Sequence, residues 1–583
     1  MTMKSMRRRT VVTVAAIVAF VGILGFRLVD IQVVNADEIK KTSVIGQPVP
    51  MTLYGSRGSI VDTNGVTLAD TVVRYDVQVS PSVAVLDKAA YTTDVNAIGA
   101  ATGQGGAAVQ KIISDALAVN PKSQYALVIK GIDVTKYDKL IALKSSLNIQ
   151  WIYFTRDSTR VYPDGAVAGN LIGFVGSDGK PQAGLESSEN SCLAGTNGSE
   201  TYQQALDGTP LPGTTVTQKP ATNGGTLQLT INSDLQWFSQ QQLAQVVPAL
   251  GAKFGFVTVA DAKTGKLLTV AQYPSVDPNN VGATPPNFWG AMSFTTPFEP
   301  GSTFKALTAA ALIDTGKATP ESQALTPYTF TSPQGAKLHD AGYHAPERLT
   351  LTGVLMLSSN VGMSILGQRL SSQDRYNYLK AFGIGSKTGA FAGESAGILN
   401  PVSTWDDQTK YATMFGQGVS ATQIQMVSAY QALANGGVRI PLTLVAGCKN
   451  ADGTVTKAPQ AAPTRVISAQ TASTTLGMME SVITKGELAK QLNIPGYRIA
   501  GKTGTAQQPD GKGGYLPSYY VSVMGVAPAE NPQYVVSVNL GYPTTLTSSA
   551  AAAPLFKTIM SQVLKTYRVK PSTTPPPNYA PYY

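Results

Sequence analysis

The sequence predicts an α+β protein with more than one domain and a largely antiparallel sheet in its second half. Its 583 residues are too many for one hydrophobic core. After residue 220, strand-like segments come first, segments with helical periodicity follow, and two further strand-like segments come late; this order is typical of an α+β domain. The expected strands are 226–231, 254–259, 266–271, 519–526 and 533–540, and the expected helices include 349–370 and 423–434.

The N-terminus predicts a membrane anchor. Basic residues precede an apolar run at 11–26, which continues in broken form to residue 34 and approaches the length that spans a bilayer. The basic flank predicts a cytoplasmic N-terminus, with the rest of the chain outside. The alternative is a cleaved signal peptide with Val34-Asn35-Ala36 as its cleavage site, but this small-residue signature is imperfect, so we favour the uncleaved anchor. Outside the cytoplasm Cys192 and Cys448 could pair, although one widely separated pair does not establish a bond.

The region before residue 220 has the features of a turn-rich scaffold without a catalytic constellation. Asn64-Gly65 is a strong hairpin signal, and residues 75–79 alternate as in a half-buried strand. Residues 88–147 have helical segments, interrupted by a Gly-rich break at 103–106. A Pro-, Gly- and Thr-rich segment at 206–225 predicts a domain boundary, and the Pro-rich segment 571–583 predicts an extended, mobile tail.

Composition narrows the classes of function. The net charge is +10, but the basic residues are spread along the chain, which fits contact with an anionic cell envelope better than a nucleic-acid-binding module. His339 and His344 are the only histidines and there are two cysteines, so no zinc-ligand spacing is present and we expect no metal or organic cofactor. A Ser-His-Asp triad would need one of these histidines. Both lie in a polar stretch rich in loop-forming residues, so we expect them to be exposed and structural.

Residues 299–305, Glu-Pro-Gly-Ser-Thr-Phe-Lys, form the strongest catalytic candidate. Pro300-Gly301 predicts a helix start, which places Ser302 in the first turn and Lys305 three residues later on the same face. A serine hydroxyl needs an adjacent base to become a good nucleophile, and a neutral lysine can serve. We therefore expect an acyl-transfer enzyme that forms an ester at Ser302.

Two further elements complete an ordered set: Ser358-Ser359-Asn360 and Lys502-Thr503-Gly504. Each pattern alone is weak, because it occurs elsewhere in the sequence. Ser177 to Lys180 repeats the first pattern within a turn, residues 146–148, 188–190 and 537–539 repeat the second, and residues 263–265 and 387–389 repeat the third. The helix start at Ser302, the apolar run before Ser358 and the late strands after Lys502 single out one set.

This set resembles that of class B penicillin-binding proteins, which are monofunctional D,D-transpeptidases of peptidoglycan synthesis, and the resemblance extends over nearly the whole chain. Before residue 220, three segments resemble the conserved boxes of the family: residues 57–65, residues 160–165 with 173–174, and residues 184–186 with Leu193, Gly195 and Gly198. Phe415-Gly416-Gln417-Gly418 resembles a glycine-rich stretch of its transpeptidase domain. Thr63 departs from the first box, where the family usually has Arg. No histidine precedes residue 339, which argues against the glycosyltransferase of class A relatives.

The resemblance implies a transpeptidase domain similar to serine β-lactamases, with helices around an antiparallel sheet. A β-rich, elongated pedestal or dimerisation domain and an N-terminal transmembrane helix would precede it. The expected limits are 1–10 for a cytoplasmic tail, 11–34 for the anchor, 35–220 for the pedestal, 221–568 for the transpeptidase domain and 569–583 for a flexible tail.

The resemblance also implies a role for each site residue. Ser302 would attack the penultimate D-alanine of a stem pentapeptide while Lys305, whose pKa the second cation Lys502 would depress, takes the proton. Ser358 would relay a proton to the leaving D-alanine, and Asn360 would bind the substrate amide. Lys502, Thr503 and Thr505 would receive the terminal carboxylate, and Gly504 would let the substrate lie flat against the strand. The backbone N–H groups of Ser302 and Thr505 would form the oxyanion hole, and β-lactams would acylate Ser302.

Several alternatives remain open from the sequence. The resemblance is to the division-type FtsI group, with a SEDS-type membrane glycosyltransferase and divisome proteins as implied partners; an elongation-type role is the alternative. A β-lactamase or β-lactam sensor would use the same three elements, but we identify no base for deacylation, and the large scaffold argues against a lactamase. Intact Ser302, Lys305 and Lys502 argue against an inactive scaffold protein.

Overall fold

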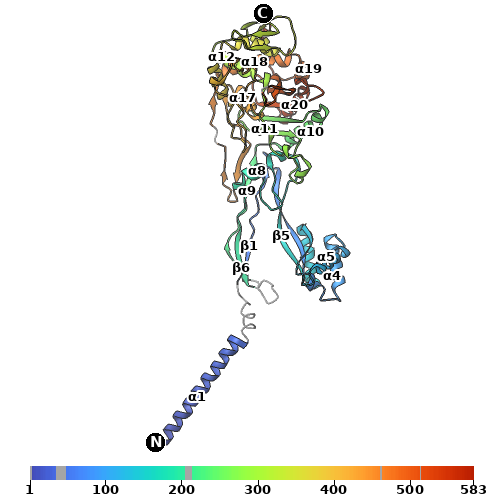
Figure 1. Cartoon of the computed structure of the whole chain (residues 1–583), viewed down its shortest axis with the longest axis vertical. Helices are drawn as coiled ribbons and strands as arrows, with labels where there is room; N and C mark the ends of the chain where they lie inside the picture. Colours follow the sequence, from blue (N-terminus) through green and yellow to red (C-terminus); the bar gives the residue numbers. More distant parts are fainter. Residues whose placement is uncertain (1–2, 35–47, 204–212, 460–461, 513) are drawn as a thin grey trace. The chain divides into compact units, whose positions relative to one another are not determined.

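The computed structural model describes residues 3–34, 48–203, 213–459, 462–512 and 514–583. The chain divides into two compact units, residues 1–56 with 195–224 and residues 57–194 with 225–583. In the first unit, helix α1 (Met3–Val29) continues as a π-helical turn, η1 (Asp30–Val34). Strands β1 (Pro48–Leu53), β6 (Gly198–Gln203) and β7 (Val216–Lys219) form an antiparallel sheet in which β6 is central, and β1 lies beside β6 (Figure 1).

The N-terminal helix has the length and composition of a membrane span. Over Arg7–Val34 its mean hydropathy is 2.4, and its apolar side chains are exposed rather than packed in a core. A signal sequence has the same properties, so the uncleaved anchor stays a prediction. Asn35 and Ala36 of the candidate cleavage site Val34-Asn35-Ala36, and the start of the expected linker at 206–212, lie outside the described residues.

The second unit begins with the scaffold strands. A sheet with the order β17–β16–β8–β2–β3–β4 contains β2 (Ile60–Val61), β3 (Thr67–Val79) and β8 (Thr226–Leu229), and β5 (Ile152–Val161) also pairs with β3. The predicted hairpin is confirmed: β2 and β3 pair antiparallel, and the Asp62 carboxylate accepts hydrogen bonds from Asn64 N and Val66 N in the turn. β8 follows residue 220 in the sequence, but it pairs with β2 of the scaffold. This sheet therefore continues across the expected domain limit at 220, and that limit stays a prediction.

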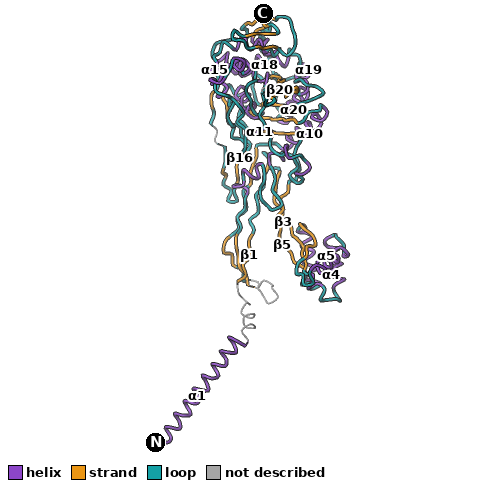
Figure 2. Tube along the Cα trace, viewed as in Figure 1, coloured by secondary structure: helices purple, strands orange, loops and turns teal. Residues whose placement is uncertain are grey.

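Helices α4 (Tyr91–Thr102), α5 (Gly106–Val119) and α6 (Val134–Ser146) pack beside β3 and β5 around a separate hydrophobic cluster (Figure 2). The break predicted at 103–106 is confirmed, because Gly103 and Gly105 have positive φ between α4 and α5. One feature of 88–147 differs from the expectation of helices alone: residues Ala126–Ile132 form strand β4, in which Ala126, Val128 and Ile132 are buried on one face.

A five-stranded antiparallel sheet forms the centre of the second unit, with the order β10–β9–β21–β20–β19. Four of the five expected strands form it as β9 (Phe254–Asp261), β10 (Leu267–Tyr273), β20 (Tyr515–Ala527) and β21 (Tyr534–Gly541), and β19 (Ala500–Pro509) forms the edge. The fifth, expected at 226–231, is β8 of the scaffold sheet. Alternation along each strand places successive side chains on opposite faces. Helices pack on both faces, as the two hydrophobic clusters show, and the α+β prediction is confirmed.

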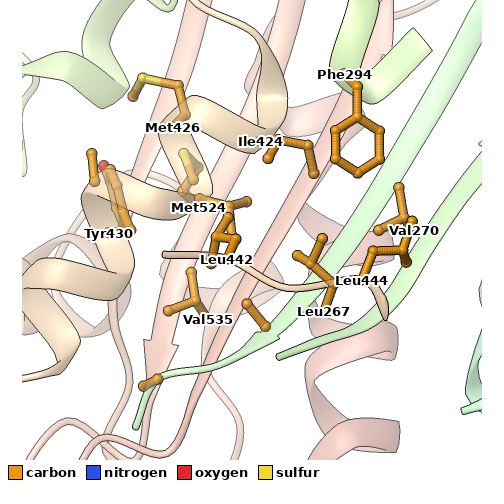
Figure 3. Close-up of a cluster of buried hydrophobic side chains, with 14 of the residues drawn as sticks. Leu267, Val270, Phe294, Ile424, Met426, Tyr430, Leu442, Leu444, Met524 and Val535 are labelled. Carbon is orange, nitrogen blue, oxygen red and sulfur yellow. The ribbon is translucent and has the colours of Figure 1, made fainter. Parts of the chain in front are cut away.

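The two faces of this sheet pack against different helices. Val536 and Val538 belong to a cluster with α10 (Ser233–Ala249) and α20 (Ala553–Thr566), whereas Val535 faces α17 (Gln423–Ala434). Figure 3 shows this second face, where Ile424, Met426 and Tyr430 of α17 meet Met524 and Val535 of the sheet. The predicted helix 423–434 coincides with α17, whose Thr422 and Gln425 form a capping box.

The helix expected at 349–370 is two helices, α13 (Leu351–Met356) and α14 (Asn360–Gly367). They are separated at Ser358, whose φ of 59° is left-handed and ends the first helix. The 3-10 turn η4 (Gly301–Phe304) leads into α12 (Lys305–Asp314), and α18 (Ala469–Thr484) packs against both α12 and α13.

The remaining elements are short and connect these parts. The helices are α3 (Pro81–Ala84), α7 (Gly169–Ile172), α8 (Gly184–Ser188), α9 (Asn190–Leu193), η2 (Val281–Ala283), η3 (Pro286–Phe288), α11 (Met292–Thr295), α15 (Ser372–Ala381), η5 (Val402–Thr404), α16 (Asp407–Ala412), α19 (Ala489–Leu492) and η6 (Ser549–Ala551). The strands are β11 (Gln323–Thr326), β12 (Thr329–Thr331), β13 (Lys337–His339), β14 (Glu347–Thr350), β15 (Val438–Arg439), β16 (Val445–Lys449), β17 (Val455–Thr456) and β18 (Thr464–Arg465).

The C-terminal segment 571–583 is extended, as predicted, but it lies against the second unit and is not free of it. Thr350 donates hydrogen bonds to the backbone carbonyls of Ala580 and Pro581 through its side chain and its N–H. Gly353 allows this approach, because a Cβ there would lie 1.9 Å from the carbonyl oxygen of Pro581. The expectation of a mobile tail missed these backbone contacts, which composition does not reveal.

Cys192 and Cys448 form a disulfide between α9 and β16, which joins residues 256 positions apart. The pairing that the sequence left open is thus present in the structure, and it links the scaffold strands to the segment that follows α17.

Candidate active site

Ser302 and Lys305 lie together at the start of α12. The Nζ atom of Lys305 is 3.0 Å from Ser302 Oγ, as the three-residue spacing predicted. The η4 turn that presents Ser302 is held by the glycine-rich stretch at 415–418, since Gly301 N donates to the Gly416 carbonyl at 2.9 Å. Gly416 has a φ of +84°, and a Cβ there would lie 2.3 Å from Gly301 O. Ser302 is half-buried, whereas Lys305 is fully buried beneath it.

Ser358 joins this pair from the break between α13 and α14. Its left-handed backbone directs its carbonyl oxygen to Lys305 Nζ, which donates a short hydrogen bond to it. Its hydroxyl lies 3.3 Å from Lys305 Nζ and 2.8 Å from Lys502 Nζ. Ser358 therefore bridges the two lysines.

Lys502 reaches the site from the edge strand β19 and is also fully buried. Its Nζ atom also donates to the carbonyl oxygen of Thr503 at 3.1 Å, and it lies 3.4 Å from that residue's hydroxyl. The four predicted catalytic residues, Ser302, Lys305, Ser358 and Lys502, are thus brought together from three distant parts of the chain.

Burial is the main cause of the shifted pKa values of both lysines. It lowers the pKa of Lys305 to about 7, although the negative charge of Asp340 acts in the opposite direction. Burial also lowers the pKa of Lys502 well below its usual value, and the positive charge of Lys305 lowers it further. The sequence predicted that Lys502 would lower the pKa of Lys305, but the lowering comes from desolvation by burial. Lys305 is therefore a base that is neutral in a substantial fraction of molecules at neutral pH.

Asp340 supports the Ser358 segment, and the sequence argument did not identify it. Its carboxylate accepts hydrogen bonds from Ser359 Oγ at 2.7 Å and from the backbone N–H groups of Asn360 and Val361 at the start of α14. His344 Nε2 lies 3.0 Å from the same carboxylate. The available signal was an aspartate in a polar loop before the apolar run, and that pattern is too common to be specific.

The two histidines have the structural roles that the sequence predicted, but His344 is half-buried and not fully exposed. Burial lowers the pKa of His344, yet its hydrogen bonds with the Ala345 carbonyl and the Asp340 carboxylate outweigh burial and raise it. His339 contributes its backbone carbonyl, which accepts a hydrogen bond from Asn360 Nδ2 at 3.1 Å. Among the described residues, the ring nitrogens of His339 and His344 form hydrogen bonds with Asp340 and Ala345, and none of these bonds involves Ser302.

The predicted substrate-binding residues of β19 lie on two faces of the strand. Thr503 and Thr505 are accessible, and Thr505 Oγ1 accepts a hydrogen bond from Ser549 N at 3.0 Å. Gly504 is buried on the other face. A Cβ at Gly504 would lie 2.5 Å from Ser522 Oγ, 3.0 Å from Thr303 Cγ2 and 3.2 Å from the Pro300 carbonyl oxygen. The expected reason for this glycine is therefore corrected: it allows β19 to pack closely on η4, and the missing side chain does not face an open strand surface.

The competing matches lie outside this cluster. Lys180 and Ser177 belong to an exposed turn in which Lys180 N donates to Asp178, and residues 263–265 form the turn between β9 and β10. In the third match, Thr388 donates to Glu394 in a loop. The structure thus separates these three repeats from the cluster of Ser302, Ser358 and Lys502 that local context in the sequence singled out.

The three scaffold boxes also meet at one buried group. The Glu186 carboxylate, which is 0% exposed, pairs with Arg57 Nε at 2.6 Å and with Arg160 Nε at 2.7 Å. Arg57 belongs to the first box, Arg160 to the second and Glu186 to the third. These two ion pairs therefore join three separated segments of the scaffold at one point.

This arrangement is that of a serine acyltransferase: a nucleophilic hydroxyl, a buried lysine base beside it, and a second serine and lysine that bridge from other elements. Residues 255–561 match the transpeptidase domain of penicillin-binding proteins, and residues 52–229 match the penicillin-binding protein dimerisation domain. The chain belongs to the penicillin-binding protein transpeptidase family.

Named relatives and solved structures agree with this assignment. The chain is 38% identical over 435 residues to the penicillin-binding protein PbpB of Mycobacterium tuberculosis, a match that covers 72% of this chain and 64% of that relative. It is 29% identical over 567 residues to the peptidoglycan D,D-transpeptidase FtsI of Escherichia coli K12, covering 95% and 91%. The crystal structure of penicillin-binding protein 3 from M. tuberculosis complexed with aztreonam superimposes with a TM-score of 0.70 at 30% identity, covering 91% of this chain and all of that one.

Proposed function

We propose that this protein is a peptidoglycan D,D-transpeptidase that crosslinks stem peptides through an acyl-enzyme at Ser302. The observation that carries the proposal is the convergence of Lys305 Nζ, Ser358 Oγ and Lys502 Nζ around the serine. The relative from E. coli is named for this reaction, and the structure from M. tuberculosis contains a β-lactam.

In the acylation step, Ser302 Oγ attacks the carbonyl carbon of the penultimate D-alanine, and its proton passes to neutral Lys305 Nζ. The tetrahedral oxyanion is stabilised by the backbone N–H groups of Ser302 and Thr505. When the C–N bond breaks, the electron pair goes to the leaving nitrogen, which takes a proton through Ser358 Oγ from the lysine pair. Terminal D-alanine leaves, and the donor peptide remains esterified to Ser302.

In the transfer step, an amine of a neighbouring stem peptide attacks the ester carbonyl and gives its proton to Lys305. The ester bond breaks, Ser302 Oγ recovers a proton, and a new amide crosslink remains. In the acylation step, before terminal D-alanine leaves, Lys502, Thr503 and Thr505 hold the terminal carboxylate of the donor, and Asn360 binds its amide. A β-lactam acylates Ser302 in the same way as the donor peptide does in the acylation step, and the ring-opened product stays attached to Ser302.

We further propose a septal, division-type role with a SEDS-type glycosyltransferase and divisome proteins as partners. The N-terminus would lie in the cytoplasm and the catalytic unit outside. The basic residues before the apolar helix and the resemblance to the FtsI group support this placement. Localisation in growing cells tests it: accumulation at the septum is expected, and a sidewall distribution would favour the elongation-type alternative.

Labelling with a fluorescent penicillin tests the catalytic assignment. Wild-type protein is expected to form a long-lived adduct, and Ser302→Ala is expected to form none, because the nucleophilic oxygen is removed. Persistent labelling of Ser302→Ala would mean that another residue is the nucleophile. Rapid loss of the wild-type adduct would indicate a β-lactamase. If wild-type protein forms no adduct at all, the protein is an inactive scaffold.

Two lysines that share the same local motif provide the matched control. Lys502→Ala is expected to slow labelling at least a hundredfold, because it removes the Nζ group that donates a hydrogen bond to Ser358 Oγ. Lys387→Ala changes the same motif in the loop at 387–389 and is expected to leave the labelling rate within about twofold. Equal effects of the two substitutions would contradict the assignment of Lys502.

A further inference from the structure

The C-terminal segment 571–583 has no role in the mechanism above, yet it contacts the elements that carry two of the catalytic residues. Near its start, Ser572 Oγ accepts a hydrogen bond from Arg498 N at 2.9 Å, and Thr574 Oγ1 accepts one from Arg498 Nη1 at 2.8 Å. Arg498 lies two residues before β19, the strand that carries Lys502. This end of the segment is therefore attached beside the lysine strand.

The other end of the segment is attached to α13, the helix that ends just before Ser358. Thr350, the N-cap of α13, donates hydrogen bonds of 2.6 and 3.0 Å to the backbone carbonyls of residues 580–581. Tyr582 forms an antiparallel bridge with Leu349 of β14. The last residues of the chain therefore pair with β14 as an added strand would.

Between these two ends the segment crosses α18. Asn578 Oδ1 accepts a hydrogen bond from Lys485 Nζ at 3.2 Å, and Tyr579 packs against the hydrophobic cluster that α13 and α18 share. α18 itself packs against α12, α13 and β19. The segment thus connects the helix that precedes Ser358 with the strand that carries Lys502, across the helix that supports both.

Two helix glycines lie directly under the segment. Gly353 is in α13 and Gly477 is in α18, although alanine is more favourable than glycine inside a helix. A Cβ at Gly353 would lie 1.9 Å from the carbonyl oxygen of Pro581, and a Cβ at Gly477 would lie 3.0 Å from Pro577 Cγ and 3.1 Å from Tyr579 Cε2. Both helices therefore carry glycine at the points where the segment crosses them, which indicates that its docked position is specific.

The segment is attached to the surface of the unit and is not part of its core. Most of its side chains are exposed, and Ser572, Tyr579 and Pro581 are half-buried. A cavity of about 260 Å³ remains beneath it, lined in part by α18 and by residues 576–579. Removal of the segment would uncover little apolar surface, so we expect the rest of the unit to fold without it.

We propose that the C-terminal segment is a positioning element of the active site. By tying α13 to the start of β19, it holds Ser358 Oγ within hydrogen-bond distance of Lys502 Nζ, and these atoms are 2.8 Å apart. The proposal rests on the proposed transpeptidase function, because it concerns the rate at which Ser302 is acylated. A displacement of about 1 Å in a catalytic group, caused far from the chemistry, can slow a reaction by up to about a hundredfold.

Truncation after Thr574 and rescue by an added peptide test this positioning role. The shortened chain lacks residues 575–583, and a fluorescent penicillin is expected to acylate it about tenfold more slowly than the full chain. A synthetic peptide with the sequence of residues 575–583 is expected to restore most of the rate, whereas a peptide of the same composition in scrambled order is not. A segment that only adds stability would leave the rate unchanged at temperatures well below the melting temperature of both chains.

Gly353→Ala tests the same contact in the full chain. The added methyl group collides with the Pro581 carbonyl and prevents docking of the last residues, while alanine favours the helix itself. Acylation is expected to slow about fivefold or more, and the added peptide is expected not to restore it, because its binding site is blocked. Gly282→Ala is the matched control: a Cβ there meets no described atom within 4 Å, so the rate is expected to stay within about twofold of wild type.

Melting temperatures show that each variant is folded. If the truncated chain does not fold, Gly353→Ala decides the question in the full chain. A folded truncated chain or a folded Gly353→Ala variant that is acylated at the wild-type rate or faster overturns the proposal. Equal rescue of the truncated chain by the native and the scrambled peptide also overturns it.

Hydrogen exchange separates this proposal from the proposed function. If the wild-type chain forms no penicillin adduct, the proposed function fails, and exchange of the backbone N–H groups of α13 and Ser358 then tests the attachment by itself. Faster exchange of these groups in the truncated chain than in the full chain supports the positioning role of the segment, and equal exchange overturns it.

Discussion

Lys305 and Lys502 are both fully buried, and each lies within hydrogen-bond distance of a serine hydroxyl. Desolvation of an ammonium group costs free energy, so burial lowers the pKa of both lysines, that of Lys305 to about 7. The sequence predicted these residues because their spacing and order are specific. It did not predict Asp340 as a support of the site, because a single carboxylate in a sequence does not reveal which backbone N–H groups it will face.

The pKa of Lys305 gives a pH dependence for acylation. Lys305 accepts the Ser302 proton only when neutral, and burial lowers its pKa to about 7. The second-order rate of penicillin acylation is therefore expected to rise about tenfold per pH unit below 7 and to level off above about 8. Stopped-flow measurements of labelling between pH 5 and 9 check this. A rate that is flat across pH 7, with the fold intact throughout, would contradict a role for neutral Lys305.

At the scale of elements, the site depends on the interruption between α13 and α14. The apolar periodicity of 349–370 correctly predicted helix, but it could not predict the break, because a left-handed serine has no sequence signature comparable to glycine. Asp340 explains how the break is held: it accepts from two backbone N–H groups at the start of α14, where unpaired donors and the helix dipole favour a carboxylate.

Replacing this carboxylate should displace the Ser358 segment. Asp340→Asn keeps the size of the side chain but removes one acceptor oxygen and the charge, so at least one N–H of α14 loses its partner. Penicillin acylation is expected to slow by about ten- to a hundredfold, with a loss of stability of about 1–3 kcal/mol. Labelling kinetics and urea unfolding measure both quantities.

The matched control is Asp133→Asn at the N-cap of α6, where Asp133 accepts from Lys136 N. This variant is expected to lose a comparable or smaller amount of stability while its acylation rate stays within about twofold. If Asp340→Asn acylates at the wild-type rate, Asp340 does not position Ser358.

At the scale of the whole molecule, segments that are distant in the sequence pair with one another in one sheet of the second unit. β8 pairs with β2 on one side and with β16 on the other, and the disulfide of Cys192 with Cys448 adds a covalent link between the same regions. Composition predicted a boundary near residue 220, and Asn64-Gly65 predicted a hairpin before it. It could not predict the pairing across the boundary, because local periodicity does not specify the partner of a strand.

The disulfide should contribute to stability without contributing to catalysis. A crosslink across 256 residues restricts the unfolded chain, so its removal in Cys192→Ser/Cys448→Ser is expected to lower the free energy of unfolding by about 2–5 kcal/mol. Denaturant unfolding measures this loss, and penicillin labelling at low temperature is expected to persist. Reducing agent should destabilise wild type but leave the double variant unchanged. Equal stability of the two proteins would show that the bond does not form.

The docked C-terminal segment has a practical consequence for work in cells. Ala580 and Pro581 are bonded to Thr350, and the Tyr583 ring lies 5.3 Å from the Arg348 guanidinium. Thr350 caps α13, the helix that ends beside Ser358. A fluorescent tag fused after Tyr583 would displace this segment from Thr350 and thereby disturb the helix that positions Ser358. Imaging tags are therefore better fused to the N-terminus.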